Sequence, residues 1–183
     1  MSEATITFKS EFELTPDEKT QINRLLSCVF TDTNYRGKAY FKQLCHHRLL
    51  LWQGFKLIGH LGIDYRVMNL NGQEIMVWGV VGLAVEPTLQ GKGLGTQLMQ
   101  EFERIALAHK HNIDFLFLVT DVPAFYERLG FAKTTLTIQW LKIYQGKNYG
   151  IANEQITDCD LMFKKVGDKN WNDGALDMLG YMY

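Results

Sequence analysis

The sequence has too few cysteines and prolines for a disulfide-bonded or a linker-rich architecture. Its 183 residues include three cysteines, none of them in CxxC spacing, and three prolines. An odd number of cysteines without paired spacing argues against a disulfide framework and agrees with a reducing compartment. No repeat or low-complexity tract marks a boundary. We therefore expect one domain over residues 1–183, a length that can bury about 70% of the unfolded surface without a covalent staple.

An excess of charge of one sign is also missing. Lys and Arg number 19 against 20 Asp and Glu, a formal net charge of −1. Nucleic-acid binding usually needs a strongly basic face, so nucleic acid is not an expected partner. The longest apolar run, residues 76–85, is about half of the ~20 residues that a membrane span needs. The first ten residues contain no apolar signal-peptide core. We therefore expect a cytoplasmic protein without a membrane partner.

The first half of the sequence predicts strands around one well-marked helix. Alternating apolar residues begin at Ile6 and Phe8 and indicate a strand. Thr15, Pro16 and Glu18 have the spacing of a capping box at the start of a helix. The other expected elements are a short helix over 38–45, strands over 48–52, 56–65 and 74–85, and a tight hairpin turn at 71–72.

The second half predicts further alternation of helix and strand. A glycine-rich segment at 90–96 leads directly into an amphipathic helix, and residues 115–119 form a continuous apolar strand. A short helix over 122–129 follows. Residues 135–183 read as strands around a loop near 146–150, then a polar and aromatic tail. This order indicates an α/β (α+β) fold with a mixed sheet rather than a regular doubly wound one.

Glycines are placed where backbone could approach a ligand. Gly79 and Gly82 interrupt the 74–85 strand, which indicates a bulge or a close approach of the backbone to a ligand. The 90–96 segment lacks the third glycine of a Rossmann motif and the Gly-Lys-Ser/Thr of a Walker A loop. It keeps the physical capacity to bind pyrophosphate through converging N–H groups, a helix start and Lys92. A plain strand–turn–helix connection explains the glycines equally well.

Two motifs together resemble the GCN5-related N-acetyltransferase (GNAT) superfamily. Leu83-Ala84-Val85-Glu86-Pro87 followed by Gln90-x-x-Gly93-x-Gly95 resembles its motif A, and Phe125 to Phe131 resembles its second cofactor motif. The likeness covers roughly residues 1–135. It implies a GNAT fold with a mixed, mostly antiparallel sheet of six to seven strands and about four helices. It also implies that residues 136–183 shape the acceptor site.

The resemblance implies acetyl-CoA as co-substrate and no metal. The backbone of the strand end would pair with the pantetheine arm, and the amides of the glycine loop would hold the pyrophosphate. The cofactor-binding residues implied in this way are Leu83, Ala84, Val85, Gly91, Lys92, Gly93, Leu94, Gly95 and Thr96. Whether the donor is acetyl-CoA or a longer acyl-CoA stays open.

The chemistry of acyl transfer requires a neutral amine, an oxyanion donor and a proton for the thiolate. Tyr126 matches the tyrosine that the superfamily places beside the cofactor sulfur, which implies that it is catalytic; a buried core tyrosine is the alternative. A backbone N–H near Val85 is the oxyanion donor by analogy. No base is assigned, because each candidate is more typical of a solvated residue or a turn cap. These candidates are Glu86, Asp64, Glu74, His60 and Asp121.

The expected acceptor is a primary amine of a small molecule. A narrower likeness to aminoglycoside 2′-N-acetyltransferases rests on residues 30–35, the 49–54 strand, Gly59-His60 and the aromatic tail 171–183. That family has an acidic residue where this chain has Val81, which weakens the case for a polycationic acceptor. Carboxylates that could still bind an acceptor are Asp32, Asp173 and Asp177, and aromatic walls could come from Tyr35, Trp78, Tyr181 and Tyr183.

Of these, Asp32 and Trp78 are the expected substrate-binding residues. A non-catalytic acetyl-CoA-binding module and a protein-acetylating enzyme remain alternatives, and a homodimer stays open. No metal site is expected, because the adjacent Cys45, His46 and His47 cannot easily chelate one ion.

Overall fold

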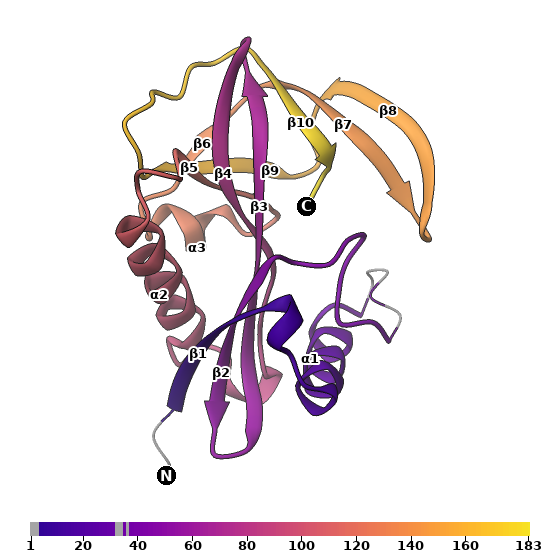
Figure 1. The fold of residues 1–183 in the computed structure, drawn as a ribbon, viewed down its shortest axis with the longest axis vertical. Helices are drawn as coiled ribbons and strands as arrows, with labels where there is room; N and C mark the ends of the chain where they lie inside the picture. Colours follow the sequence, from indigo (N-terminus) through magenta and orange to yellow (C-terminus); the bar gives the residue numbers. More distant parts are fainter. Residues whose placement is uncertain (1–3, 32–34, 36) are drawn as a thin grey trace. The chain divides into compact units, whose positions relative to one another are not determined.

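The computed structural model describes residues 4–31, 35 and 37–183. They form two compact units, one of Met1–Asp64 with Val81–Arg104 and the other of Tyr65–Val80 with Ile105–Tyr183. Three elements pass along the chain from one unit into the other: β3 (Lys56–Leu70), β4 (Gln73–Val85) and α2 (Leu94–Ala108) (Figure 1).

The described residues contain ten strands and three α-helices. The remaining strands are β1 (Ala4–Ser10), β2 (His47–Gln53), β5 (Phe115–Thr120), β6 (Ala132–Thr134), β7 (Thr137–Tyr144), β8 (Lys147–Gln155), β9 (Asp160–Lys165) and β10 (Ala175–Tyr181). The remaining helices are α1 (Pro16–Val29) and α3 (Pro123–Glu127), with 3₁₀ turns η1 (Glu11–Glu13) and η2 (Pro87–Leu89). The mixed α/β class is confirmed, with more strands and fewer helices than expected.

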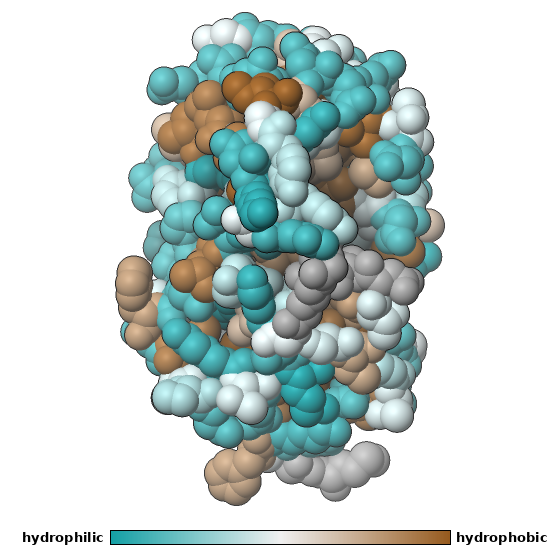
Figure 2. Space-filling view, turned by 90° about the vertical axis from the view of Figure 1, so that its right-hand side faces the viewer, coloured by the Kyte–Doolittle hydropathy of each residue, from teal (hydrophilic) through white to brown (hydrophobic). Residues whose placement is uncertain are grey.

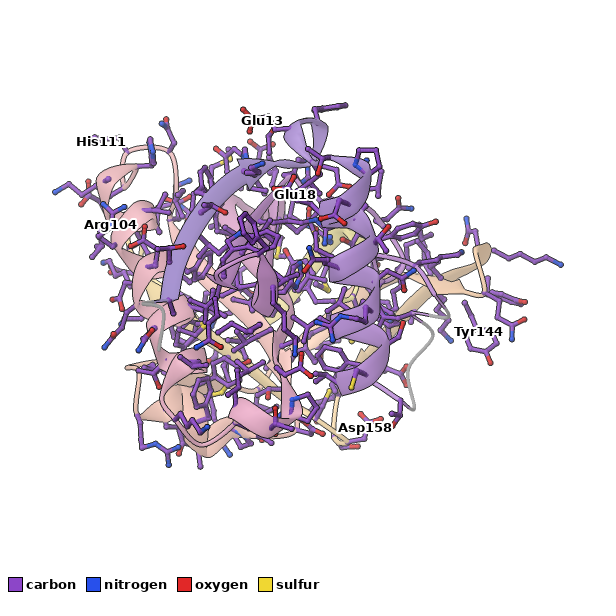
Figure 3. All side chains as sticks on the ribbon, turned by 90° about the horizontal axis from the view of Figure 1, so that it is seen from below. Glu13, Glu18, Arg104, His111, Tyr144 and Asp158 are labelled. Atoms are coloured by element: carbon purple, nitrogen blue, oxygen red, sulfur yellow. The ribbon has the colours of Figure 1, made fainter. Side chains whose placement is uncertain are left out.

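In the first unit, α1 packs on a short antiparallel sheet. β2 pairs with β1 on one side and with β3 on the other. The capping box is confirmed: Thr15 accepts a hydrogen bond from the Glu18 amide at 3.2 Å, and the Glu18 carboxylate accepts one from the Thr15 amide at 2.8 Å. Glu18, labelled in Figure 3, also pairs with Lys9 at 2.6 Å. The apolar face of α1 contributes Ile22, Leu25 and Leu26 to the core of this unit.

In the second unit, the strand order is β6-β9-β5-β4-β3-β10-β7-β8. β5 runs parallel to β4, and β10 runs parallel to β7, while β5–β9, β6–β9, β3–β10 and β7–β8 are antiparallel. The core is formed by buried side chains of this sheet, including Phe115, Phe117 and Ile138. Figure 1 shows β7 and β8 as a curved pair beside β10.

The hairpin turn at 71–72 is confirmed. Asn71 and Gly72 have φ angles of 53° and 86°, so both lie in the left-handed region that a tight two-residue turn between twisted strands requires. Asn71 also accepts a hydrogen bond from the Ala175 amide at 2.7 Å. The turn therefore fixes both the β3–β4 register and the start of β10.

Two sequence expectations about local structure are wrong. Residues 38–45 form no helix: Lys42 has a φ of 56°, and Phe41 makes an isolated bridge with Gln43. The expected loop at 146–150 is largely strand β8, because the turn needs only Gln145 and Gly146. The tail, for which the sequence indicated only a polar and aromatic character, contains β10, which inserts between β3 and β7.

The surface carries polar and apolar side chains side by side. The face drawn in Figure 2 is mainly hydrophilic, with apolar residues in scattered groups. In the part of the chain that the structure describes, no helix has the length and apolar character required to cross a membrane.

Candidate functional site

A kink in β4 is the first feature of the site. Gly82 has a φ of 62° within the strand, the left-handed conformation found at bulges. A side chain at this position would also overlap the hydroxyl of Tyr35, whose own side chain is 5% exposed. Position 82 therefore needs glycine, both for its conformation and for its packing against Tyr35.

A buried polar chain supports this kink from within the first unit. Arg48 Nε donates to Glu11 Oε2 at 2.7 Å, and Arg48 Nη1 lies 2.9 Å from His60 Nε2. His60 Nδ1 lies 2.8 Å from the carbonyl oxygen of Gly82. Arg48 and His60 are 0% and 1% exposed. Because a guanidinium only donates, His60 Nε2 must accept, and the neutral Nδ1–H tautomer donates to Gly82.

Electrostatics agree with a neutral His60. Burial lowers the pKa of His60 from 6.5 to about 3, and the neighbouring charge of Arg48 is the second cause of this shift. The hydrogen bond to Gly82 acts in the opposite direction and raises this pKa. His60 therefore holds the Gly82 carbonyl without carrying charge at neutral pH. Sequence analysis missed Glu11, in η1, and Arg48, in β2, because no local pattern indicates which charged residues become buried.

The glycine-rich loop follows the end of β4. Gly91 and Gly93 have φ angles of 75° and 80°, and no atom lies within 4 Å of the position that a Cβ would take at either. Both glycines are required by conformation rather than by crowding. Lys92 between them is exposed, and no described residue forms an ion pair with it. Left-handed residues next to a helix start direct amide groups outward in a way that suits anions.

All nine expected cofactor-binding residues lie in the first unit, along β4, the loop and the first turn of α2. Two hydrogen bonds fix the junction of strand and loop: the Glu86 amide donates to the Ile58 carbonyl at 2.8 Å, and Gln90 Nε2 donates to the Val85 carbonyl at 3.2 Å. The Gln97 amide donates to the Gly93 carbonyl at 3.0 Å and closes the first turn of α2. The arrangement can bind an anionic group by backbone amides and one mobile ammonium.

Tyr126 lies on α3 in the second unit and is 7% exposed. Its ring contacts those of Phe125 and Phe131 edge-on, with centroids 4.9 and 5.9 Å apart. Burial, and secondarily the charge of Asp121, raises the pKa of Tyr126 to about 12. No residue in the described part of the chain is hydrogen-bonded to its hydroxyl. The phenol is therefore protonated at neutral pH and free to donate to a ligand.

Of the two expected substrate-binding residues, the structure describes only Trp78. Asp32 lies outside the described residues. Trp78 is 6% exposed in the second unit, and its ring contacts those of Tyr65 and His109 at 6.4 and 6.5 Å. Gly79 next to it admits Tyr183: a Cβ at Gly79 would overlap the tyrosine ring. The close approach expected at Gly79 is therefore to the chain's own tail, not to a ligand.

The candidate bases are mostly engaged elsewhere. Against the expectation of solvated residues, His60 and Asp64 are buried, and Asp64 lies 2.7 Å from His46. Burial acts to raise the pKa of Glu86, but hydrogen bonds and charge from Arg24 and Lys56 outweigh it and lower that pKa. Glu74 and Asp121 are exposed, as expected. The structure adds no reason to assign a base.

The Cys45-His46-His47 segment is used for packing. Cys45 is 4% exposed, and burial, more than neighbouring charges, raises the pKa of its thiol to about 11. His47 stacks on Phe8 with ring centroids 5.0 Å apart. Within the described ranges, no group of three or more His, Cys, Asp or Glu side chains is arranged to hold a metal ion.

Comparison with known proteins turns this geometry into a family assignment. A family model described as an acetyltransferase (GNAT) domain matches residues 13–134, two thirds of the sequence. The chain belongs to the GNAT acetyltransferase family. The matched residues include both the glycine loop and Tyr126. Membership of this family places the protein among the acyltransferases. No curated protein matches the sequence significantly.

Solved GNAT structures share the fold. The N-acetyltransferase YhbS from Escherichia coli, in complex with CoA, aligns over 97% of this chain and 90% of its own, with a TM-score of 0.64 and 19% identity. An acyl-CoA N-acyltransferase from Pseudomonas aeruginosa aligns over 88% and 99%, with a TM-score of 0.60 and 19% identity. The ribosomal-protein-S18-alanine N-acetyltransferase from Escherichia coli aligns over 92% of this chain and 98% of its own, with a TM-score of 0.57 and 17% identity. These likenesses establish the GNAT fold.

Proposed function

We propose that the chain is an N-acetyltransferase that moves the acetyl group of acetyl-CoA to a primary amine of a small molecule by direct attack. The observation that carries the proposal is the β4–loop–α2 segment, in which two left-handed glycines and the exposed Lys92 precede a helix start. This segment suits the pyrophosphate of CoA. A metal is not needed for the reaction, and none is part of the proposal.

The reaction balances without an additional reagent. The lone pair of the neutral amine attacks the thioester carbonyl carbon, and a C–N bond forms. The C–S bond then breaks, the nitrogen loses a proton, and the thiolate gains one, which gives the N-acetyl amine and CoA. A backbone N–H near Val85 is proposed to stabilise the oxyanion, because the pairing of β4 with β5 covers only Val77–Gly79 and does not reach this strand end.

Tyr126 is proposed as the donor to the leaving thiolate. Three observations support it: its motif position, a hydroxyl without a described partner, and the raised pKa that keeps it protonated. A general acid must carry its proton at the operating pH. A core tyrosine with a satisfied hydroxyl, the alternative interpretation, would show a partner for that hydroxyl.

Two alternatives remain distinguishable. A non-catalytic module would bind acetyl-CoA without transfer, and the unpartnered Tyr126 hydroxyl disfavours it. An aminoglycoside 2′-N-acetyltransferase would require several carboxylates around a polycation, and Val81 replaces the acidic residue expected for that family.

The test is calorimetric titration with acetyl-CoA, followed by a CoA-release assay with acetyl-CoA and a panel of amines, diamines, aminoglycosides and peptides. We expect acetyl-CoA binding and CoA release with a small amine. Binding without turnover on any acceptor would support the non-catalytic module. Turnover confined to aminoglycosides or to peptides would replace the proposed acceptor class, and absence of acetyl-CoA binding would refute the proposal.

A further inference from the structure

A groove in the second unit lies where the β7–β10 ladder is broken. The parallel pairing runs to Asp177 opposite Gln139 and resumes at Tyr181 opposite Leu141. β10 therefore places residues 178–180 opposite the single residue 140 of β7. A cavity of about 280 Å³ opens at this break, and Gln139, Trp140, Leu141, Ile151, Asp177 and Leu179 line it. The groove is therefore formed by the register shift between β7 and β10 rather than by a loop.

The groove exposes apolar side chains to water. Leu179 is 59% exposed and Ile151 is 68% exposed. Leu179 also has a φ of 46°, which is unfavourable for a residue with a large side chain. Exposed apolar surface combined with backbone strain is a common property of ligand sites. An apolar segment of a ligand would cover this surface.

Asp177 supplies the only carboxylate among these lining residues. One of its oxygens accepts from Gln139 Nε2 at 2.7 Å, and the other accepts from the Leu179 amide at 2.9 Å. Both donors are neutral, and no described cation forms an ion pair with Asp177. Arg66 lies against Gly180 but donates to the Tyr181 carbonyl and covers the rings of Tyr181 and Tyr183 at 4.3 and 4.6 Å. The half-buried carboxylate thus has its hydrogen bonds in place and its charge uncompensated.

We propose that this groove binds the acceptor, and that the acceptor is a diamine whose second ammonium group pairs with Asp177 while its alkyl chain covers Leu179 and Ile151. The proposal rests on the proposed N-acetyltransferase function. An ammonium held by a carboxylate is stabilised in its charged form, and a charged nitrogen has no lone pair with which to attack. The group at Asp177 is therefore not the reacting amine, so the acceptor carries two.

The same features disfavour an aminoglycoside here. The cavity lies just below the usual size range of small-molecule sites, about 300–1,000 Å³, and four of its six named lining residues are apolar. A polyhydroxylated sugar would leave hydroxyl groups unpaired against Leu141, Ile151 and Leu179. Asp173, the other tail carboxylate considered from sequence, does not line the groove and faces Thr134 at 3.5 Å.

Titration calorimetry without acetyl-CoA tests the inference independently of catalysis. The probes are 1,6-diaminohexane and hexylamine, which differ in one ammonium group. We expect the wild-type protein to bind the diamine at least tenfold more tightly. Asp177→Asn should reduce this preference to below threefold, and Asp177→Glu should restore part of it. Asp168→Asn is the matched control, because Asp168 is exposed and forms no ion pair or hydrogen bond with a described residue. This variant should bind the two probes like the wild type.

Asp177→Asn also separates recognition from folding. Its amide oxygen still accepts from the Leu179 amide, so the thermal midpoint should stay near the wild-type value. In the CoA-release assay the variant should raise KM for the diamine at least tenfold and leave KM for acetyl-CoA unchanged. Equal binding of the two probes, or no binding of the diamine, would overturn the inference. In that case, acetyl-CoA binding and turnover on another amine would still support the proposed function. Diamine binding with no acetyl-CoA binding would refute the proposed function instead.

Discussion

Arg48 and His60 meet in complete burial, with Arg48 Nη1 2.9 Å from His60 Nε2, and the contact decides which ring nitrogen of His60 carries the proton. The pair links two distant parts of the first unit, because Arg48 also binds Glu11 and His60 also binds the Gly82 carbonyl. Arg48 Nη2 is buried without a hydrogen-bond partner in the described part of the chain. The network therefore joins the N-terminal segment to Gly82, which precedes the strand end proposed to bind the cofactor.

Removal of the arginine should be strongly destabilising. Arg48→Ala leaves the buried Glu11 carboxylate without its partner and removes the donor to His60, so we expect the free energy of unfolding to fall by about 3–5 kcal/mol. Urea denaturation measures it. Arg104→Ala is the matched control, since Arg104 lies at the surface (Figure 3) and, among the described residues, forms an ion pair only with Glu101 on the same helix. The free energy of unfolding of this variant should stay close to wild type. A similar small effect for both variants would contradict the structural role of the network.

His60 should make stability fall in acid. Its pKa is 6.5 in the unfolded chain and about 3 in the folded protein, so between these values the unfolded state binds a proton that the folded state refuses. The free energy of unfolding then decreases as pH falls from 6.5, by up to about 1.4 kcal/mol per pH unit. His60→Gln removes this dependence. Urea denaturation at several pH values from 7 to 4 should show a steeper decline for wild type; parallel profiles would show that His60 takes up its proton in the folded state as well.

Tyr126→Phe should lower kcat by about 10²-fold or more while the Kd of acetyl-CoA stays unchanged, because the variant loses a proton donor and keeps the ring. The measurements are CoA release at saturating substrates and calorimetric titration. Tyr144→Phe is the control, since Tyr144 is 51% exposed at the end of β7 (Figure 3). Because the pKa of Tyr126 is about 12, its deprotonation should not limit the rate below about pH 10. Unchanged turnover would remove Tyr126 from the mechanism.

Gly91→Ala should weaken acetyl-CoA binding by at least tenfold, since alanine disfavours the left-handed φ of 75° that directs the loop amides. Gly54→Ala is a closely matched control: Gly54 has a φ of 59°, lies equally in open space, and belongs to the β2–β3 turn. Both variants should lose similar stability, and only Gly91→Ala should lose affinity. Equal affinities in titration calorimetry would show that this loop does not hold the cofactor.

Gly79→Ala should destabilise the second unit by about 1–3 kcal/mol, because the added methyl group overlaps the Tyr183 ring. Tyr183→Ala should vacate that space. In a double-mutant cycle followed by urea denaturation, Gly79→Ala should therefore cost less in the Tyr183→Ala background than in wild type. Strict additivity of the two substitutions would show that the tail does not pack on β4 in solution.

Local interactions made several elements predictable from sequence. The capping box of Thr15 and Glu18 and the left-handed turn at 71–72 satisfy their own backbone groups within a few residues, so their form is independent of the rest of the chain. The helix expected over 38–45 had no comparable cap, and a helix that short is marginal alone. In its place, Phe41 packs against Tyr35 with ring centroids 5.5 Å apart, so tertiary packing determined the conformation.

The sequence alone indicated the family and predicted the segment proposed to bind the cofactor, because both depend on short motifs in which neighbouring residues set backbone conformation. Only the tertiary structure decided which polar residues are buried and where the tail lies. Arg48 meets His60 through β2–β3 pairing, and Asp177 reaches its groove because β10 inserts between β3 and β7. Pairing between strands far apart in sequence depends on the free energy of the whole sheet and core, which no local pattern contains.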